Sequence, residues 1–198
     1  AFAMPTGFSA LNNLTVNRTN GVSIWADLEL DGILTLTSGI LSLGNYHLTL
    51  KNAIAGAGAT TNMSSTSGSS LTILGDLFDF ITIPSSVGDL KALTLNNPNG
   101  TTLIGGLTIA ETLTLTNGIL VLNDDDLSVP ASGITGGAAS YVNVNSINDG
   151  RLTITGVTSS AVSIPVGYSY LTLDSYTPLT LSNSETTGFE IGIKRIND

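Results

Sequence analysis

Short apolar triplets at nearly constant spacing are the feature that most constrains the fold. Each triplet places two aliphatic residues around one residue that is usually small and polar. Four of them, Leu28–Leu30, Leu34–Leu36, Leu41–Leu43 and Leu48–Leu50, begin six, seven and seven residues apart. Because alternate side chains of a β-strand point to opposite faces, we expect the aliphatic residues to face a core and the middle residues to face solvent.

The same arrangement recurs 79 positions later in the chain, so that Leu14 corresponds to Leu93. Residues 14–50 align without gaps to residues 93–129, and roughly 15 of the 37 aligned pairs are identical. The identical pairs include Gly39 and Gly118, which we predict to occupy a bend with positive φ that a residue with a Cβ would resist. The chain therefore contains a duplicated structural module.

Strands of three residues are too short for a meander of conventional hairpins. If three such strands close one coil, a coil takes about 20 residues, a module has about four coils, and successive coils stack about 4.8 Å apart. We therefore predict an all-β fold, a right-handed parallel β-helix (a solenoid), over residues 1–140. A projecting loop is expected at residues 56–70, which are small and polar. Residues 141–198 form a continuing β region, either a truncated solenoid end or the start of a β-sandwich.

Composition excludes several classes of function. The net charge of −9 repels phosphate backbones and anionic lipid headgroups, so we expect no nucleic-acid partner and no membrane insertion. Cysteine is absent, which excludes disulfides and thiolate metal sites. Residues 1–10 have neither a basic region nor an apolar run of the kind found in signal peptides. We expect the chain to be a segment of a longer protein.

One acidic cluster, Asp124, Asp125 and Asp126, has the hard oxygen donors that Ca²⁺ prefers. At the same place in the first module the chain has Asn45, Tyr46 and His47, so the turn does not depend on carboxylates. We therefore expect no cofactor, with calcium at the three aspartates as the alternative.

Catalytic residues are not expected. Asp27, Glu29 and Asp31 alternate outward along one strand, and two of them could act as acid and base in a glycosidase or a polysaccharide lyase. A solvated edge is the favoured interpretation of these three residues. His47 is the sole histidine, has no neighbouring nucleophile motif and is expected to be an exposed turn residue. The chain is therefore predicted not to be an enzyme.

Two surfaces are candidates for a ligand. Trp25, Tyr46 and Tyr141 could stack on sugar rings, as aromatic faces do with apolar surfaces. Outward hydroxyls of Thr112, Thr114 and Thr116 could contribute to a carbohydrate-binding face or to an ice-binding one. Ice binding is disfavoured because we expect such threonines once per module, with other residues between them at most coils.

The chain resembles the repeat regions of very large secreted surface proteins of the Bacteroidota, which are exported by the type IX secretion system. The resemblance rests on LTLTSGILSLGNYHLTL and LTLTNGILVLNDDDLSV, and on Ile164–Gly167 followed by Ser175–Leu181. It implies a non-enzymatic stalk or scaffold segment of an extracellular, cell-surface adhesin-like protein. Its partners would be flanking repeats of the same polypeptide, neighbouring copies, end-to-end or side-by-side, and a polysaccharide. A carbohydrate-binding module is the alternative function, and an ice-binding solenoid or a polysaccharide lyase is less favoured.

Overall fold

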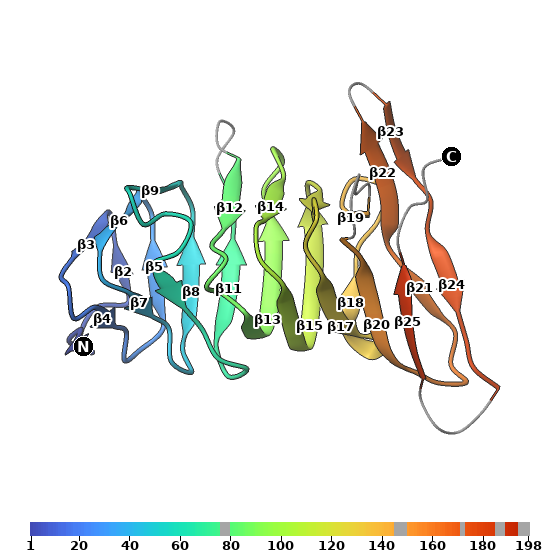
Figure 1. Ribbon diagram of the computed structural model, residues 1–198, viewed down its shortest axis with the longest axis horizontal. Coiled ribbons are helices and arrows are strands. Elements are labelled where there is room, and N and C mark those ends of the chain that lie inside the picture. Colours follow the sequence, from blue (N-terminus) through green and yellow to red (C-terminus); the bar gives the residue numbers. More distant parts are fainter. Residues whose placement is uncertain (76–79, 145–149, 171–172, 185–188, 194–198) are drawn as a thin grey trace.

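The computed structural model describes residues 1–75, 80–144, 150–170, 173–184 and 189–193. It is 52% strand and 2% helix, and the chain winds into a β-solenoid of about eight turns with roughly 20 residues per turn. The coils follow one another in sequence order along the long axis of the molecule (Figure 1). The parallel β-helix predicted from the triplets is therefore confirmed.

One wall of the solenoid is a ten-stranded sheet, which we call the long wall. Its pairs are parallel from its first strand to β20, and the final pair, β20 with β25, is antiparallel. The strand β18 (Ile134–Thr135) also belongs to this sheet and pairs with β15. In spatial order the other strands are β2 (Ala10–Leu11), β5 (Leu28–Leu30), β8 (His47–Leu50), β11 (Ser70–Ile73), β13 (Asp89–Asn96), β15 (Leu107–Asn117), β17 (Leu127–Pro130), β20 (Leu152–Val157) and β25 (Phe189–Ile193).

Two further sheets, one with four strands and one with six, contain strands at equivalent sequence positions of the two modules. The first contains β1 (Phe2–Ala3), β4 (Val22–Ser23), β7 (Leu41–Ser42) and β10 (Met63–Ser64). The second contains β12 (Ile81–Ile83), β14 (Thr101–Leu103), β16 (Leu120–Val121), β19 (Val142–Asn143), β22 (Val166–Tyr170) and β23 (Leu173–Tyr176).

Smaller elements complete the fold. A three-stranded sheet is formed by β3 (Leu14–Asn17), β6 (Leu34–Ser38) and β9 (Ile54–Ala55), and a two-stranded sheet by β21 (Val162–Ile164) and β24 (Leu179–Leu181). In the described part of the chain, the helical structure is the short 3₁₀ turn Ala131–Gly133.

The interior consists of aliphatic columns that run along the axis. Strand pairing stacks Leu48 on Leu28 and Leu71 on Leu48, and the same column continues through Leu93 and Leu113. All of these leucines are buried, whereas the middle residues of their triplets are half-buried on the outer face. Each fully buried aliphatic side chain contributes about 1.5 to 3 kcal/mol, so the columns are the main source of stability.

The two modules share their backbone shape at the predicted bend. Gly39 and Gly118 have φ of 75° and 79°, which confirms the prediction of positive φ. A Cβ on either residue would lie 1.8 Å from a backbone oxygen, that of Arg18 or that of Asn97. Both positions therefore require glycine.

Equivalent strands of the modules do not always lie in the same sheet. Leu14–Val16 pair with β6 in the three-stranded sheet, whereas their counterparts Leu93–Leu95 belong to the long wall and pair with β11 and β15. The cause is the fourth coil, in which the single strand β11 contacts β8 on one side and β13 on the other. The cross-section of the solenoid thus changes between the modules.

The expectation of one projecting loop over residues 56–70 is wrong in part. Met63 and Ser64 pair with Leu41 and Ser42, and the side chain of Met63 is buried in the core. The strand β11 then begins at Ser70. The chain therefore returns to the solenoid within this stretch, because Met63 supplies an apolar side chain that extends the interior column.

Parallel stacking gives way to antiparallel pairing at the C-terminal end. Three pairs are antiparallel there: β20 with β25, β21 with β24, and β22 with β23. These strands lie at the orange and red end of the molecule (Figure 1). The strand β22 still stacks in parallel on β19 of the preceding coil, so the final strands fold back onto the end of the solenoid.

Candidate functional site

Exposed aromatic side chains occupy one corner of the first three coils. The chain turns this corner between a strand of the four-stranded sheet and the next strand of the long wall. The pairings of Ser23 with Ala3 and Ser42, and of Glu29 with Ala10 and Thr49, establish this arrangement. In successive coils the corner carries Phe8, Trp25 and Tyr46, with exposed fractions of 51%, 57% and 37%. We call these three residues the aromatic corner.

Tyr141, the third aromatic residue considered as a sugar platform, is not available for that role. It is 2% exposed, and its ring lies 5.8 Å from that of Tyr176. It precedes β19, and its ring is covered by the C-terminal strands β22 and β23, which carry Gly167 and Tyr176. This expectation is wrong because the final strands fold back over the end of the solenoid and cover the ring.

A shallow groove of about 210 Å³ lies beside the aromatic corner. Its lining consists of Ser9, Asp27, Leu28, Glu29, His47 and Thr49, which come from three successive coils. The backbone N–H of His47 donates to Asp27 Oδ1 at 2.8 Å, and His47 Nε2 lies 2.8 Å from Thr72 Oγ1. His47 is therefore half-buried and held by neighbouring coils, whereas the sequence predicts an exposed turn residue.

Asp27, Glu29 and Asp31 lie on the outer face of the long wall, as expected. Lys51 on the next coil binds two of them, with its Nζ 2.5 Å from Glu29 Oε1 and 2.7 Å from Asp31 Oδ1. These hydrogen bonds, first that to Asp31 and then that to Glu29, raise the pKa of Lys51 above its ordinary value. The carboxylates of this row are thus tied into a network with neighbouring coils.

Thr114 belongs to a continuous column of threonines on the long wall. The pairings place Thr49, Thr72, Thr94, Thr114 and Thr135 side by side on consecutive strands. The expectation that such threonines recur once per module is therefore wrong, because strand register places residues from unlike positions of the modules in one column. Thr112 is exposed in the adjacent column, which also contains Ser70 and Ala92, and Thr116 is exposed near the end of β15.

The three aspartates considered for calcium precede β17, at the turn of the second module that corresponds in sequence to Asn45, Tyr46 and His47. Burial raises the pKa of Asp125 above its ordinary value, and the charges of Asp124 and Asp126 raise it further. Asp126 Oδ1 accepts the backbone N–H of Arg151 at 3.1 Å, and its Oδ2 lies 3.5 Å from Arg151 Nη2. Among the described residues, no group of three or more His, Cys, Asp or Glu side chains is arranged to hold a metal ion.

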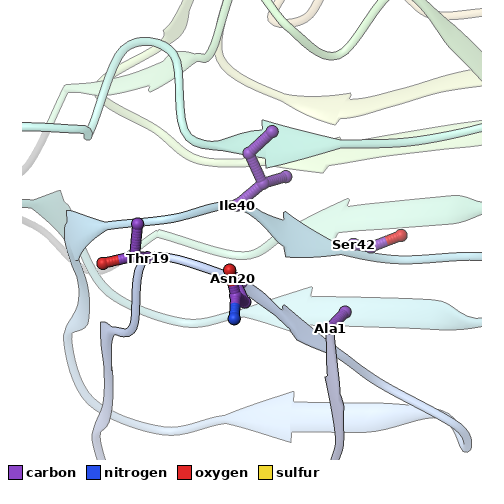
Figure 2. Close-up of a pocket in the computed structure, with 6 residues that line it drawn as sticks. Ala1, Thr19, Asn20, Ile40 and Ser42 are labelled. Carbon is purple, nitrogen blue, oxygen red and sulfur yellow. The ribbon is translucent and has the colours of Figure 1, made fainter.

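A second kind of groove is repeated in the two modules. In the first module it is lined by Ala1, Thr19, Asn20, Gly21, Ile40 and Ser42, and Figure 2 shows these residues on neighbouring coils. The residues 79 positions later line its counterpart: Phe80, Pro98, Asn99, Gly100, Ile119 and Val121. Both grooves lie beside a glycine with positive φ, Gly21 or Gly100. They are a consequence of the repeated backbone, because both form although three of the six lining residues differ between the modules.

Sequence reasoning identified Trp25 and Tyr46 individually but missed that they share a corner, and it missed Phe8. The spacing contains a signal: each aromatic residue precedes a long-wall strand by one to three residues. Among the described residues, no helix is long and apolar enough to cross a lipid bilayer. No family model matches this chain, and neither a curated protein nor a solved structure matches it.

Proposed function

We propose that this chain is a non-enzymatic structural segment, a stiff spacer within an extracellular adhesin-like surface protein of a bacterium. The observation that carries the proposal is the uninterrupted aliphatic interior, whose columns link successive coils from Leu28 to Ile134. Because each coil contacts its neighbours along one axis, the length of such a molecule grows with the number of repeats. The sequence resemblance to Bacteroidota surface proteins supports the same role.

Stiffness is the property that a distance measurement can test. The absence of cysteine allows two unique labels, introduced by Thr6→Cys near one end and Thr180→Cys in β24 near the other. Single-molecule energy transfer between them should give one narrow distance distribution. Insertion of a second copy of residues 14–92 should lengthen that distance by about 19 Å, four coils of about 4.8 Å each. A broad distribution, or a distance unchanged by the added module, would overturn the spacer role.

Extracellular placement has its own test. Antibodies raised against this chain should label intact cells of a bacterium that produces it, without permeabilisation. Labelling that requires permeabilised cells would contradict placement at the cell surface, whatever the stiffness of the solenoid.

The threonine column favours a second candidate, an ice-binding surface. Five hydroxyl-bearing side chains repeat at the coil spacing of about 4.8 Å, which is the kind of regular array that can order water. The adjacent column is mixed, with Ser70, Ala92 and Thr112. Thermal hysteresis and faceted ice crystals that are lost in Thr94→Tyr would support this candidate. Unaltered disc-shaped ice in the presence of the chain would exclude it.

A further inference from the structure

We infer that the aromatic corner and the groove beside it bind an uncharged polysaccharide. Phe8, Trp25 and Tyr46 come from consecutive coils, so their rings are distributed over about 10 Å along the axis at a coil spacing of about 4.8 Å. Aromatic rings present flat apolar faces, which suit the C–H faces of pyranose rings. An extended glycan chain can therefore lie along the corner and contact more than one coil.

The groove supplies the polar half of such a site. Asp27 and Glu29 offer carboxylate oxygens that accept hydrogen bonds from sugar hydroxyls, and Ser9 and Thr49 offer hydroxyl groups that donate or accept. Ligand sites commonly combine apolar surface with a few placed polar groups in this way. The two sets of groups adjoin each other, since Trp25 and Asp27 are two residues apart in the turn that precedes β5.

Several polar side chains of the groove are already fixed before any ligand binds. Asp27 accepts the backbone N–H of His47, the His47 ring contacts Thr72, and Lys51 holds Glu29. Groups held in this way lose little conformational freedom on binding, which favours affinity.

The second module shows that the scaffold does not need these groups. The residues 79 positions after Trp25, Asp27 and Glu29 are Ile104, Gly106 and Thr108. Those after Tyr46 and His47 are Asp125 and Asp126. The leucines of the same strands are retained, as in Leu28 and Leu107. The aromatic and polar groups are thus an addition to one module of a repeated fold.

Charge selects the class of glycan. Asp27 and Glu29 line the groove, and Asp31 follows them in the same row. Lys51 is paired to Glu29 and Asp31, and the whole chain has a net charge of −9. An acidic polysaccharide would meet repulsion at this surface. A neutral one would meet hydrogen-bond acceptors and apolar ring faces.

Affinity electrophoresis tests the inference with the chain as it is. The gels contain mixed-linkage β-glucan, xylan or galactomannan as neutral probes, and polygalacturonate or alginate as acidic ones. We expect at least one neutral polysaccharide to retard the chain and the acidic ones to leave its mobility unchanged. Trp25→Ala should weaken the binding about tenfold or more, and Tyr46→Ala should weaken it several-fold, as for central aromatic contacts at other interfaces.

The repeat provides a matched control. Ile104→Ala changes the residue equivalent to Trp25 in the second module and should leave retardation unchanged. Circular dichroism and thermal unfolding establish that each variant is folded. The inference is overturned if no neutral polysaccharide retards the chain, if only acidic ones do, or if folded Trp25→Ala and Tyr46→Ala variants bind as well as the parent. The spacer role would survive each of these outcomes, because it depends on the distance measurement alone.

Discussion

Single residues with unusual backbone conformations shape both modules in the same way. Gly39 and Gly118 share a positive φ, and so do Gly44 and its counterpart Asn123, at 57° and 53°. Asparagine tolerates the left-handed region better than other residues with a Cβ, which explains why the substitution of Gly44 by Asn123 is accepted. The amide of Asn123 also donates to the Leu103 carbonyl at 3.3 Å. The backbone conformation of these bends therefore depends on residues that tolerate positive φ, and not on surrounding contacts alone.

Gly39→Ala is expected to destabilise the solenoid by more than about 2 kcal/mol, since it adds a strained φ to a clash with the Arg18 carbonyl oxygen. Urea unfolding followed by circular dichroism measures the loss. Gly88→Ala is the control, because a Cβ there meets no atom within 4 Å. Equal midpoints for the two variants would mean that the bend at Gly39 can relax.

Thr101→Val is expected to stabilise the chain by about 1 kcal/mol, because a buried hydroxyl without a partner carries a desolvation cost. Thr101 stacks between Ile81 and Leu120, and its Oγ1 makes no hydrogen bond to the described residues. The first module has Val22 at the same place. A lower urea midpoint for the variant would show that the hydroxyl has a favourable role in the folded chain.

Asp125→Asn is expected to stabilise the chain at neutral pH by less than about 1 kcal/mol, as is usual for surface charges. The pKa of Asp125 is raised in the folded state, so the parent chain loses stability as the pH rises from the ordinary value of 3.8 through the raised pKa. Thermal unfolding at pH 7 should show the gain, and at pH 3 the two proteins should agree. If Asp125→Asn were also more stable than the parent chain at pH 3, the increase in stability would have a cause other than charge.

The triplets predict where the strands lie and which of their residues are buried. They do not predict which residues of successive coils lie side by side on the outer face. Leu28 and Leu30 are buried on either side of Glu29, as period-two alternation predicts. Which residue lies beside which depends instead on the length of each coil. Successive members of the threonine column are 23, 22, 20 and 21 positions apart, because the turns differ in length. A pattern search at the single fixed offset between the modules therefore identifies the modules but misses the column and the aromatic corner.

Leu93→Ala removes a central member of an aliphatic column and is expected to cost about 2 to 5 kcal/mol. Leu93 is fully buried and pairs with Leu71 on one side and Leu113 on the other. Ile33→Ala is the matched control, since Ile33 is exposed, and it should change the free energy of unfolding by less than about 0.5 kcal/mol. Similar losses for both variants in urea unfolding would contradict the dominance of the interior columns.

At the scale of the whole molecule, hydrogen bonds between coils run along the long axis and the modules add length in whole coils. The sequence predicts this stacking because the offset between the modules corresponds to about four coils of about 20 residues. The antiparallel pairing of the last strands could not be predicted in the same way. Apolar residues occupy alternate positions in the sequence of Phe189–Ile193, and this alternation is the same for both directions of pairing.

Deletion of residues 14–92 should leave a folded solenoid that is shorter by about 19 Å, since the removed module holds about four coils of about 4.8 Å. Leu93 then follows Asn13 in place of Leu14, and it can pair with Leu113 as Leu14 pairs with Leu34. Small-angle scattering measures the maximum dimension, and circular dichroism the strand content. An unfolded product would show that the cross-section change at β11 is needed for the second module to fold.

The reversal of strand direction at β23, β24 and β25 gives the two ends of the solenoid different chemistry. The short strands β1, β2 and β3 present edges on which a further coil can be added in the same direction, whereas the opposite face does not offer the same template. Because every end-to-end junction joins one N-terminal edge to one C-terminal face, the antiparallel strands act as a cap that disfavours uncontrolled stacking of these units into fibres.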